Sequence, residues 1–198
     1  MWSRFSAVLL VLIVGWGVLA PPGHAQAPAA PFDLAQLMAS LATVKSATAQ
    51  FTERKYLRML KSPLSDSGVL IYAAPDKLQK NTLAPTLENL TIAGDALTIE
   101  RQGQTQTLSL SAYPQIGGFI EGIRATLAGD LAALQRIYDT HLDGTQSAWQ
   151  LILQPRDDKM QAVVRAIYIG GNDNHITRIQ TIEHDGDRTD MTIVQANP

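Results

Sequence analysis

The chain has 198 residues, a formal net charge of −2 at pH 7 and no cysteine. The slight excess of acidic residues disfavours a nucleic-acid partner, and the lack of cysteine excludes disulfides and thiolate chemistry. Its length and its 45% content of hydrophobic residues fit one domain with a substantial core.

The first 25 residues have the pattern of a secretory signal peptide. Arg4 supplies the positive charge, and residues 5–20 form an uncharged apolar run that ends at two prolines. The sequence therefore predicts export, with a flexible leader over residues 26–31 and a single domain over residues 32–198. The alternative is an uncleaved anchor, which a basic cluster after the apolar run would favour, but none follows.

A short helix is predicted at the start of the domain. Apolar residues recur at helical spacing from Leu34 to Val44, and Asp33 can cap the first turn. Beyond Lys45 the chain changes to short runs rich in Thr, Val, Ile and Tyr, which are typical of strands separated by turns. These predicted strands are residues 46–56, 68–74, 77–83, 86–93, 96–101 and 105–110.

A helical insertion then interrupts the strands. Helical spacing of apolar residues runs from Ile116 to Leu127, and a second stripe begins at Leu131 after a Gly-Asp pair that can stop one helix and cap the next. Strands resume at residues 147–154, 162–170, 175–184 and 188–195, joined by turns at 172–174 and 185–187.

An antiparallel sheet of this length must curl to cover its apolar face. Three short amphipathic helices are few to fill the resulting concave surface, so the sequence predicts a half-barrel with helices across its mouth. Incomplete packing would leave an apolar cavity, and a completely filled core is the equally simple alternative.

Residues 32–195 also contain a series of different short motifs. They lie at residues 49–52, 68–78, 129–131, 149–155, 176–182 and 185–189. In this order they resemble the outer-membrane lipoprotein carrier family, whose members have a Phe-bearing first strand followed by a Gly-x-Leu strand that ends in Pro. The chain resembles a divergent member of that family.

The resemblance implies an α+β fold: a curved antiparallel unclosed β-barrel of about ten to eleven strands, with short helices covering the concave face. It further implies a periplasmic monomer without cofactor or metal, whose apolar interior holds the acyl chains of a lipoprotein or another lipid. An inner-membrane exporter would supply this cargo and an outer-membrane acceptor would receive it.

One departure from the family pattern bears on the cargo. Many members have Arg directly before the strand-ending Pro, where it ties the barrel to the lid, whereas this chain has Ala74 before Pro75. The aromatic residue expected a few positions later is also absent. These differences fit a divergent branch that carries another lipid or serves another exporter.

Candidate lipid-contacting residues are the apolar and aromatic side chains of the predicted strands and lid helix. They are Phe51, Leu70, Tyr72, Leu78, Leu90, Ile92, Phe119, Ile120, Ile123, Trp149, Leu151 and Leu153. The basic residues Arg54, Lys55, Arg58 and Lys61 form a charge-dense stretch. This stretch is either the solvated end of a hairpin or a docking rim for an acidic partner.

No motif in the chain indicates catalysis. The sequence has no Gly-x-Ser-x-Gly elbow, phosphate-binding loop or His-Glu-x-x-His helix. Asp139, His141 and Asp143 would share one face of an extended segment, but they follow a predicted helix and precede Gly144, which favours a solvated loop over a metal site. We therefore expect a carrier rather than an enzyme, with a periplasmic lipid-sensing regulator as the alternative.

Overall fold

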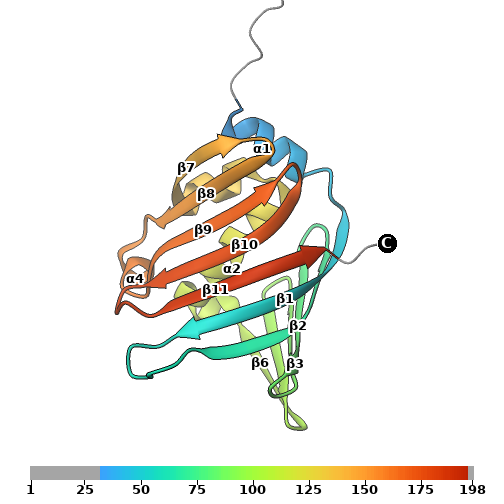
Figure 1. The fold of residues 1–198 in the computed structure, drawn as a ribbon, viewed down its shortest axis with the longest axis vertical. Coiled ribbons are helices and arrows are strands. Elements are labelled where there is room, and N and C mark those ends of the chain that lie inside the picture. Colours follow the sequence, from blue (N-terminus) through green and yellow to red (C-terminus); the bar gives the residue numbers. More distant parts are fainter. Residues whose placement is uncertain (1–31, 196–198) are drawn as a thin grey trace, which may run out of the picture. The chain divides into compact units, whose positions relative to one another are not determined.

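Eleven antiparallel strands form one curved sheet around a set of short helices (Figure 1). The computed structural model describes residues 32–195, so the predicted signal peptide and leader lie outside the described residues. The strand order is β6-β5-β4-β3-β2-β1-β11-β10-β9-β8-β7. Because β6 and β7 are the two edges, the sheet stays open, and the predicted unclosed barrel is confirmed.

The elements alternate as two runs of strands separated by a helical insertion. The first run follows helix α1 (Leu34–Leu41) and consists of β1 (Ser46–Tyr56), β2 (Leu64–Ala73), β3 (Lys77–Ala84), β4 (Glu88–Ala93), β5 (Ala96–Arg101) and β6 (Gln104–Ser109). The insertion comprises the short 3₁₀ helix η1 (Leu110–Ala112), α2 (Pro114–Ala128) and α3 (Leu131–Ile137). The second run is β7 (Tyr138–Thr145), β8 (Ala148–Pro155), α4 (Asp158–Gln161), β9 (Val164–Asn172), β10 (His175–Glu183) and β11 (Arg188–Gln195).

The helix boundaries follow from local sequence. Asp33 and Gln36 form a reciprocal capping box at the start of α1. Helix α2 ends at Gly129, whose φ of 68° suits glycine, and Asp130 caps α3 by accepting from the Ala133 amide. All three boundaries were predicted, from Asp33, Gly129 and Asp130.

Residues 138–145 form strand β7, whereas the sequence predicted the end of a helix and a loop. The helical stripe runs without interruption into Tyr138, so sequence spacing does not reveal where α3 gives way to the strand. Tyr138 pairs with Pro155 of β8, and its buried hydroxyl donates to the Gly118 carbonyl at 3.1 Å. This contact with α2 is long-range, and it fixes the start of β7. Two smaller differences are that β2 begins at Leu64 and that the short helix α4 precedes β9.

The helices cover mainly the half of the concave face formed by β7, β8 and β9. Fully buried residues of β8 and β9 pack there with Leu37 of α1 and Leu134 of α3. The half formed by β1 to β5 is covered less completely. Within residues 32–195 no helix combines the length and apolar composition needed to span a bilayer.

Candidate functional site

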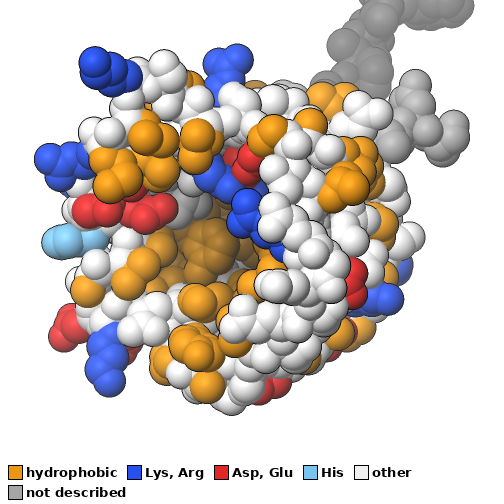
Figure 2. Space-filling view, turned by 90° about the horizontal axis from the view of Figure 1, so that it is seen from below, with side chains coloured by type: hydrophobic (Ala, Val, Ile, Leu, Met, Phe, Trp, Pro, Cys, Tyr) orange, Lys and Arg blue, Asp and Glu red, His pale blue; other side chains and the backbone are white. Residues whose placement is uncertain are grey.

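A cavity of about 1150 Å³ lies between the concave face of the sheet and helix α2. Its lining is mostly apolar and comes from β1 to β5, β9 to β11, and the face of α2 that carries Phe119, Ile120 and Ile123. Figure 2 shows the opening as a hollow with hydrophobic side chains inside and charged side chains at part of its rim. Its volume exceeds the roughly 300–1,000 Å³ of common small-molecule pockets.

Most of the sequence-predicted lipid-contacting residues lie in this lining. Those that line the cavity are Leu70, Tyr72, Leu78, Leu90, Ile92, Phe119, Ile120 and Ile123. They come from β2, β3, β4 and α2. The antiparallel register places the strand residues side by side, and α2 adds its three residues from across the cavity. Their contact with a lipid stays a prediction.

Trp149, Leu151 and Leu153 lie outside the lining. They occupy the concave side of β8, where the helices fill the space, and their exposed fractions are 3%, 0% and 0%. The Trp149 indole packs over Gly171 and donates to the Asp173 carbonyl at 3.1 Å. These three residues are core residues of the filled half.

Phe51 also lies outside the lining, although it is on the concave side of β1. Its ring lies beneath the Lys80 side chain, with the ammonium nitrogen 5.1 Å from the ring centroid. Gly68 pairs with Phe51 on β2, and a side chain at Gly68 would collide with Asn81 and crowd the ring. Phe51 is thus covered by a charged side chain rather than facing the cavity.

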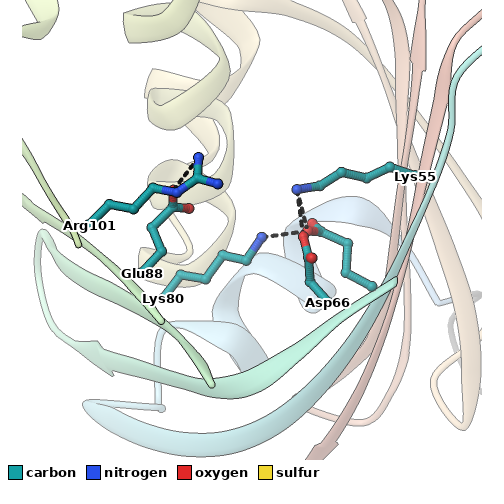
Figure 3. A network of polar contacts seen from close by, with 6 residues as sticks. Lys55, Asp66, Lys80, Glu88 and Arg101 are labelled. Atoms are coloured by element: carbon teal, nitrogen blue, oxygen red, sulfur yellow. Dashed lines mark hydrogen bonds and ion pairs between the residues drawn. The ribbon is translucent and has the colours of Figure 1, made fainter. Parts of the chain in front are cut away.

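Glu53 and Lys80 are the only carboxylate and ammonium among the residues that line the cavity. Glu53 is buried, and its Oε2 accepts from Lys80 Nζ at 2.6 Å and lies 3.3 Å from Lys55 Nζ. Lys55 also donates to Asp66 at 2.7 Å. Figure 3 shows Lys55 beside Asp66, with Lys80 extending toward them across the concave face.

The neighbouring carboxylates keep Lys55 charged. Burial alone would lower the pKa of Lys55, but hydrogen bonding and attraction to Asp66 and Glu53 outweigh burial and raise this pKa above its ordinary value. Sequence reasoning missed the network because Lys80 is far from Glu53 along the chain. The sequence did contain an indication of this network: Glu53 and Lys80 are charged residues at positions of β1 and β3 that face the apolar side of the sheet.

Tyr72 places a phenolic hydroxyl in the lining. The residue is 5% exposed, its hydroxyl has no hydrogen-bond partner among the described residues, and burial raises its pKa. An unpartnered buried hydroxyl carries a desolvation cost. It adds a polar atom to the otherwise apolar wall of β2.

Arg124 connects helix α2 to the rim of the barrel. Its guanidinium donates to the Gly94 carbonyl at 3.1 Å and lies 3.4 Å from the Asp76 carboxylate. Asp76 also accepts from the Gly94 amide at 3.2 Å. Ala74 cannot make the contact between barrel and lid that the resemblance assigns to an Arg at this position. Here Arg124, on helix α2, contacts the barrel instead. Arg124 is the only basic residue of α2, which was the signal available in the sequence.

Removing this tie should loosen α2. We expect Arg124→Met to speed amide hydrogen exchange in α2 by about fivefold, because a partly exposed ion pair contributes up to about 1 kcal/mol. Arg136→Met, on the exposed side of α3, removes the same charge without breaking a tie and serves as the control. Equal exchange in the two variants would show that Arg124 does not hold the lid.

The four basic residues of the predicted docking rim are not brought together. Lys55 faces the concave side and Arg54 the opposite side, because side chains alternate along β1. Arg58 ties the β1–β2 loop to the β10–β11 turn, donating to the Asp185 carbonyl at 2.6 Å and, through its amide, to Asp187 at 2.8 Å. Lys61 is exposed in the same loop. Docking through these residues stays a prediction.

Two clusters in the described residues contain potential metal ligands. Asp139 pairs with Arg156 at 2.7 Å, while His141 Nε2 lies 3.0 Å from Asp143, so these three β7 side chains do not converge. Ligand atoms of Glu183, Asp185 and Asp187 lie within 4.8 Å of one another at the β10–β11 turn. Burial and the two aspartates raise the pKa of Glu183, but the turn itself accounts for the arrangement.

The described residues thus form an open antiparallel sheet around a large, mostly apolar cavity that helix α2 covers on one side. Residues 25–197 match the family model described as outer membrane lipoprotein carrier protein LolA-like. The chain belongs to this LolA-like family, which confirms the resemblance found in the sequence.

Comparison with solved structures gives distant matches over most of the chain. A LolA superfamily protein from Nitrosomonas europaea is 10% identical, with a TM-score of 0.44, and the match covers 82% of this chain and 93% of that one. The lipoprotein LppX of Mycobacterium tuberculosis is 12% identical, with a TM-score of 0.42 and coverages of 83% and 95%. The match to the MucA/MucB complex of Pseudomonas aeruginosa has 13% sequence identity and a TM-score of 0.43, and it covers 84% of this chain and 59% of that one. A search among curated proteins finds no significant match.

Proposed function

We propose that this protein is a periplasmic carrier that holds the acyl chains of a lipoprotein or another lipid and moves them between the inner and outer membranes. The observation that carries the proposal is the apolar cavity of about 1150 Å³ under α2. Membership in a family described by a lipoprotein carrier supports it. The lining offers hydrophobic contact rather than a set of reacting groups.

Burial of a hydrocarbon chain supplies enough energy for such binding. Each methylene removed from water contributes about 0.8 kcal/mol, so ten methylenes contribute about 8 kcal/mol before the entropic cost of association. Release then requires a competing apolar acceptor or an opening of α2. The tie through Arg124 gives α2 a closed position that can be lost without unfolding the sheet.

A bulky side chain placed in the cavity should weaken acyl-chain binding. We expect Ala47→Trp to reduce uptake of a fluorescent fatty acid by tenfold or more, because Ala47 lines the cavity on β1 and the indole would occupy the space of the chain. Gln50→Trp places the same side chain on the exposed, opposite face of β1 and should bind as the wild type does. Circular dichroism checks that both variants fold.

Lipids that copurify with the protein from the periplasm test the cargo directly. Mass spectrometry of such preparations should find bound lipid in the wild type and in Gln50→Trp, but little in Ala47→Trp. Absence of bound lipid together with absence of fatty-acid uptake would refute the proposal. A protein that binds lipid but transfers none between separated vesicle populations would instead be the lipid-sensing regulator.

A further inference from the structure

The cavity lining carries one carboxylate–ammonium pair in a mostly apolar surface. Leu78, Ile92 and Leu97 are paired across β3, β4 and β5 and form an apolar row. The charged pair of Glu53 and Lys80 lies on the same concave face. A ligand matched to this lining would have one polar end and one hydrocarbon end.

Lys80 rises out of an apolar surface. Its partners on the two neighbouring strands are Leu70 and Leu90, and both also line the cavity. The side chain crosses the Phe51 ring at the place where β2 carries Gly68, so no side chain from β2 blocks its path. The ammonium group is therefore held at a defined position, and its side chain is 20% exposed.

The hydrogen bonding of this pair is unequal. Glu53 Oε2 faces two ammonium groups, those of Lys80 and Lys55. Among the described residues, Lys80 has Glu53 as its single hydrogen-bond partner, although an ammonium group can donate three bonds. Glu53 thus has two cationic neighbours, whereas Lys80 keeps donors to spare for a further acceptor.

Hydroxyl groups extend the polar part of the lining. Thr181 and Thr189 are paired on β10 and β11, and Thr189 is paired in turn with Lys55 of β1. Both threonines line the cavity. Figure 2 shows that basic and acidic side chains lie beside the hollow on the face where it opens.

We propose that the cavity binds an amphiphile with an anionic, oxygen-bearing head, either a carboxylate or a phosphate ester, and that Lys80 binds this head while the hydrocarbon tail lies along the apolar row. This inference rests on the proposed acyl-chain binding and adds the chemistry of the head group. The head uses the spare donors of Lys80, and Lys55 continues to balance Glu53. Charge-assisted bonds of this kind are stronger than neutral ones.

Ligands with one chain length and different heads test the inference. Dodecanoate, dodecyl phosphate, dodecanol and dodecylamine would compete at pH 8 with an uncharged fluorescent reporter, N-phenyl-1-naphthylamine. We expect both anionic ligands to bind about tenfold or more tightly than dodecanol, and dodecylamine to bind less tightly than dodecanol. The ratio between dodecanoate and dodecyl phosphate would then distinguish a fatty acid from a phosphate-bearing lipid.

Lys80→Met should remove the preference without removing the cavity. In this variant the anionic ligands should bind no more tightly than dodecanol, and dodecanol should still displace the reporter. Lys77→Met is the matched control, because Lys77 lies on the exposed, opposite face of β3. Lys80→Gln provides a second neutral variant if Lys80→Met folds poorly.

The outcomes separate the inference from the proposed function. Equal affinity of the wild type for dodecanoate and dodecanol, tighter binding of dodecylamine, or an unchanged preference in a folded Lys80→Met would overturn the role of Lys80. Each of those results would leave acyl-chain binding intact. Failure of all four ligands to displace the reporter would count against the acyl-chain cavity itself.

Discussion

Glu53→Leu is expected to lower the free energy of unfolding by about 3 kcal/mol. The substitution leaves the Lys80 ammonium in an apolar lining without the carboxylate that it contacts at 2.6 Å. Lys55 keeps Asp66 as a partner, so the main loss falls on Lys80. Urea unfolding followed by circular dichroism measures this change as a lower midpoint urea concentration, with the dependence of the unfolding free energy on urea concentration unchanged.

Removing both charges should be far less harmful than removing one. The double variant Glu53→Leu/Lys80→Met is expected to recover most of the loss, because replacement of a whole buried ion pair by apolar side chains is often nearly neutral. Glu88→Leu is the matched control at a separate ion pair (Figure 3): its partner Arg101 lies 3.8 Å away and is 58% exposed, so we expect a change of about 1 kcal/mol or less. A double variant as unstable as Glu53→Leu would show that the stability lies in the Glu53 side chain rather than in the pair.

Local signals predicted most of the fold. The turn at Gln102 and Gly103 takes positive φ angles of 51° and 76°, as a two-residue hairpin requires, and the Asp33 cap forms as its sequence indicates. These features depend on a few neighbouring residues. Strand β7 was missed because its start depends on the contact of Tyr138 with α2, which no local pattern contains.

The cavity lining was predicted only in part because alternation along a strand does not say how a face is covered. Tyr72 and Trp149 both lie on the concave side of the sheet, but α1, α2 and α3 fill the space over β8 and leave the space over β2 open. Helix placement decides which concave residues meet a cavity and which become core. The Glu53–Lys80 contact likewise depends on strand register across Gly68.

The filled half of the barrel should dominate stability. We expect Trp149→Ala to lower the free energy of unfolding by about 3–5 kcal/mol, a large share of the roughly 5–15 kcal/mol typical of a domain. The substitution removes a 3% exposed indole from the core and leaves the Asp173 carbonyl without its donor. Thermal unfolding followed by circular dichroism measures the loss.

Graded replacements on the same strand separate packing from the hydrogen bond. Trp149→Phe keeps an aromatic ring over Gly171 but not the bond to Asp173, so it should lose about half as much as Trp149→Ala. Gln150→Ala, on the exposed face of β8, should change stability by less than about 0.5 kcal/mol. Because Trp149 lies outside the cavity lining, each variant should still bind the fluorescent reporter at temperatures where it is folded. Selective loss of reporter binding in a folded Trp149→Phe would place this side chain in the binding site rather than in the core.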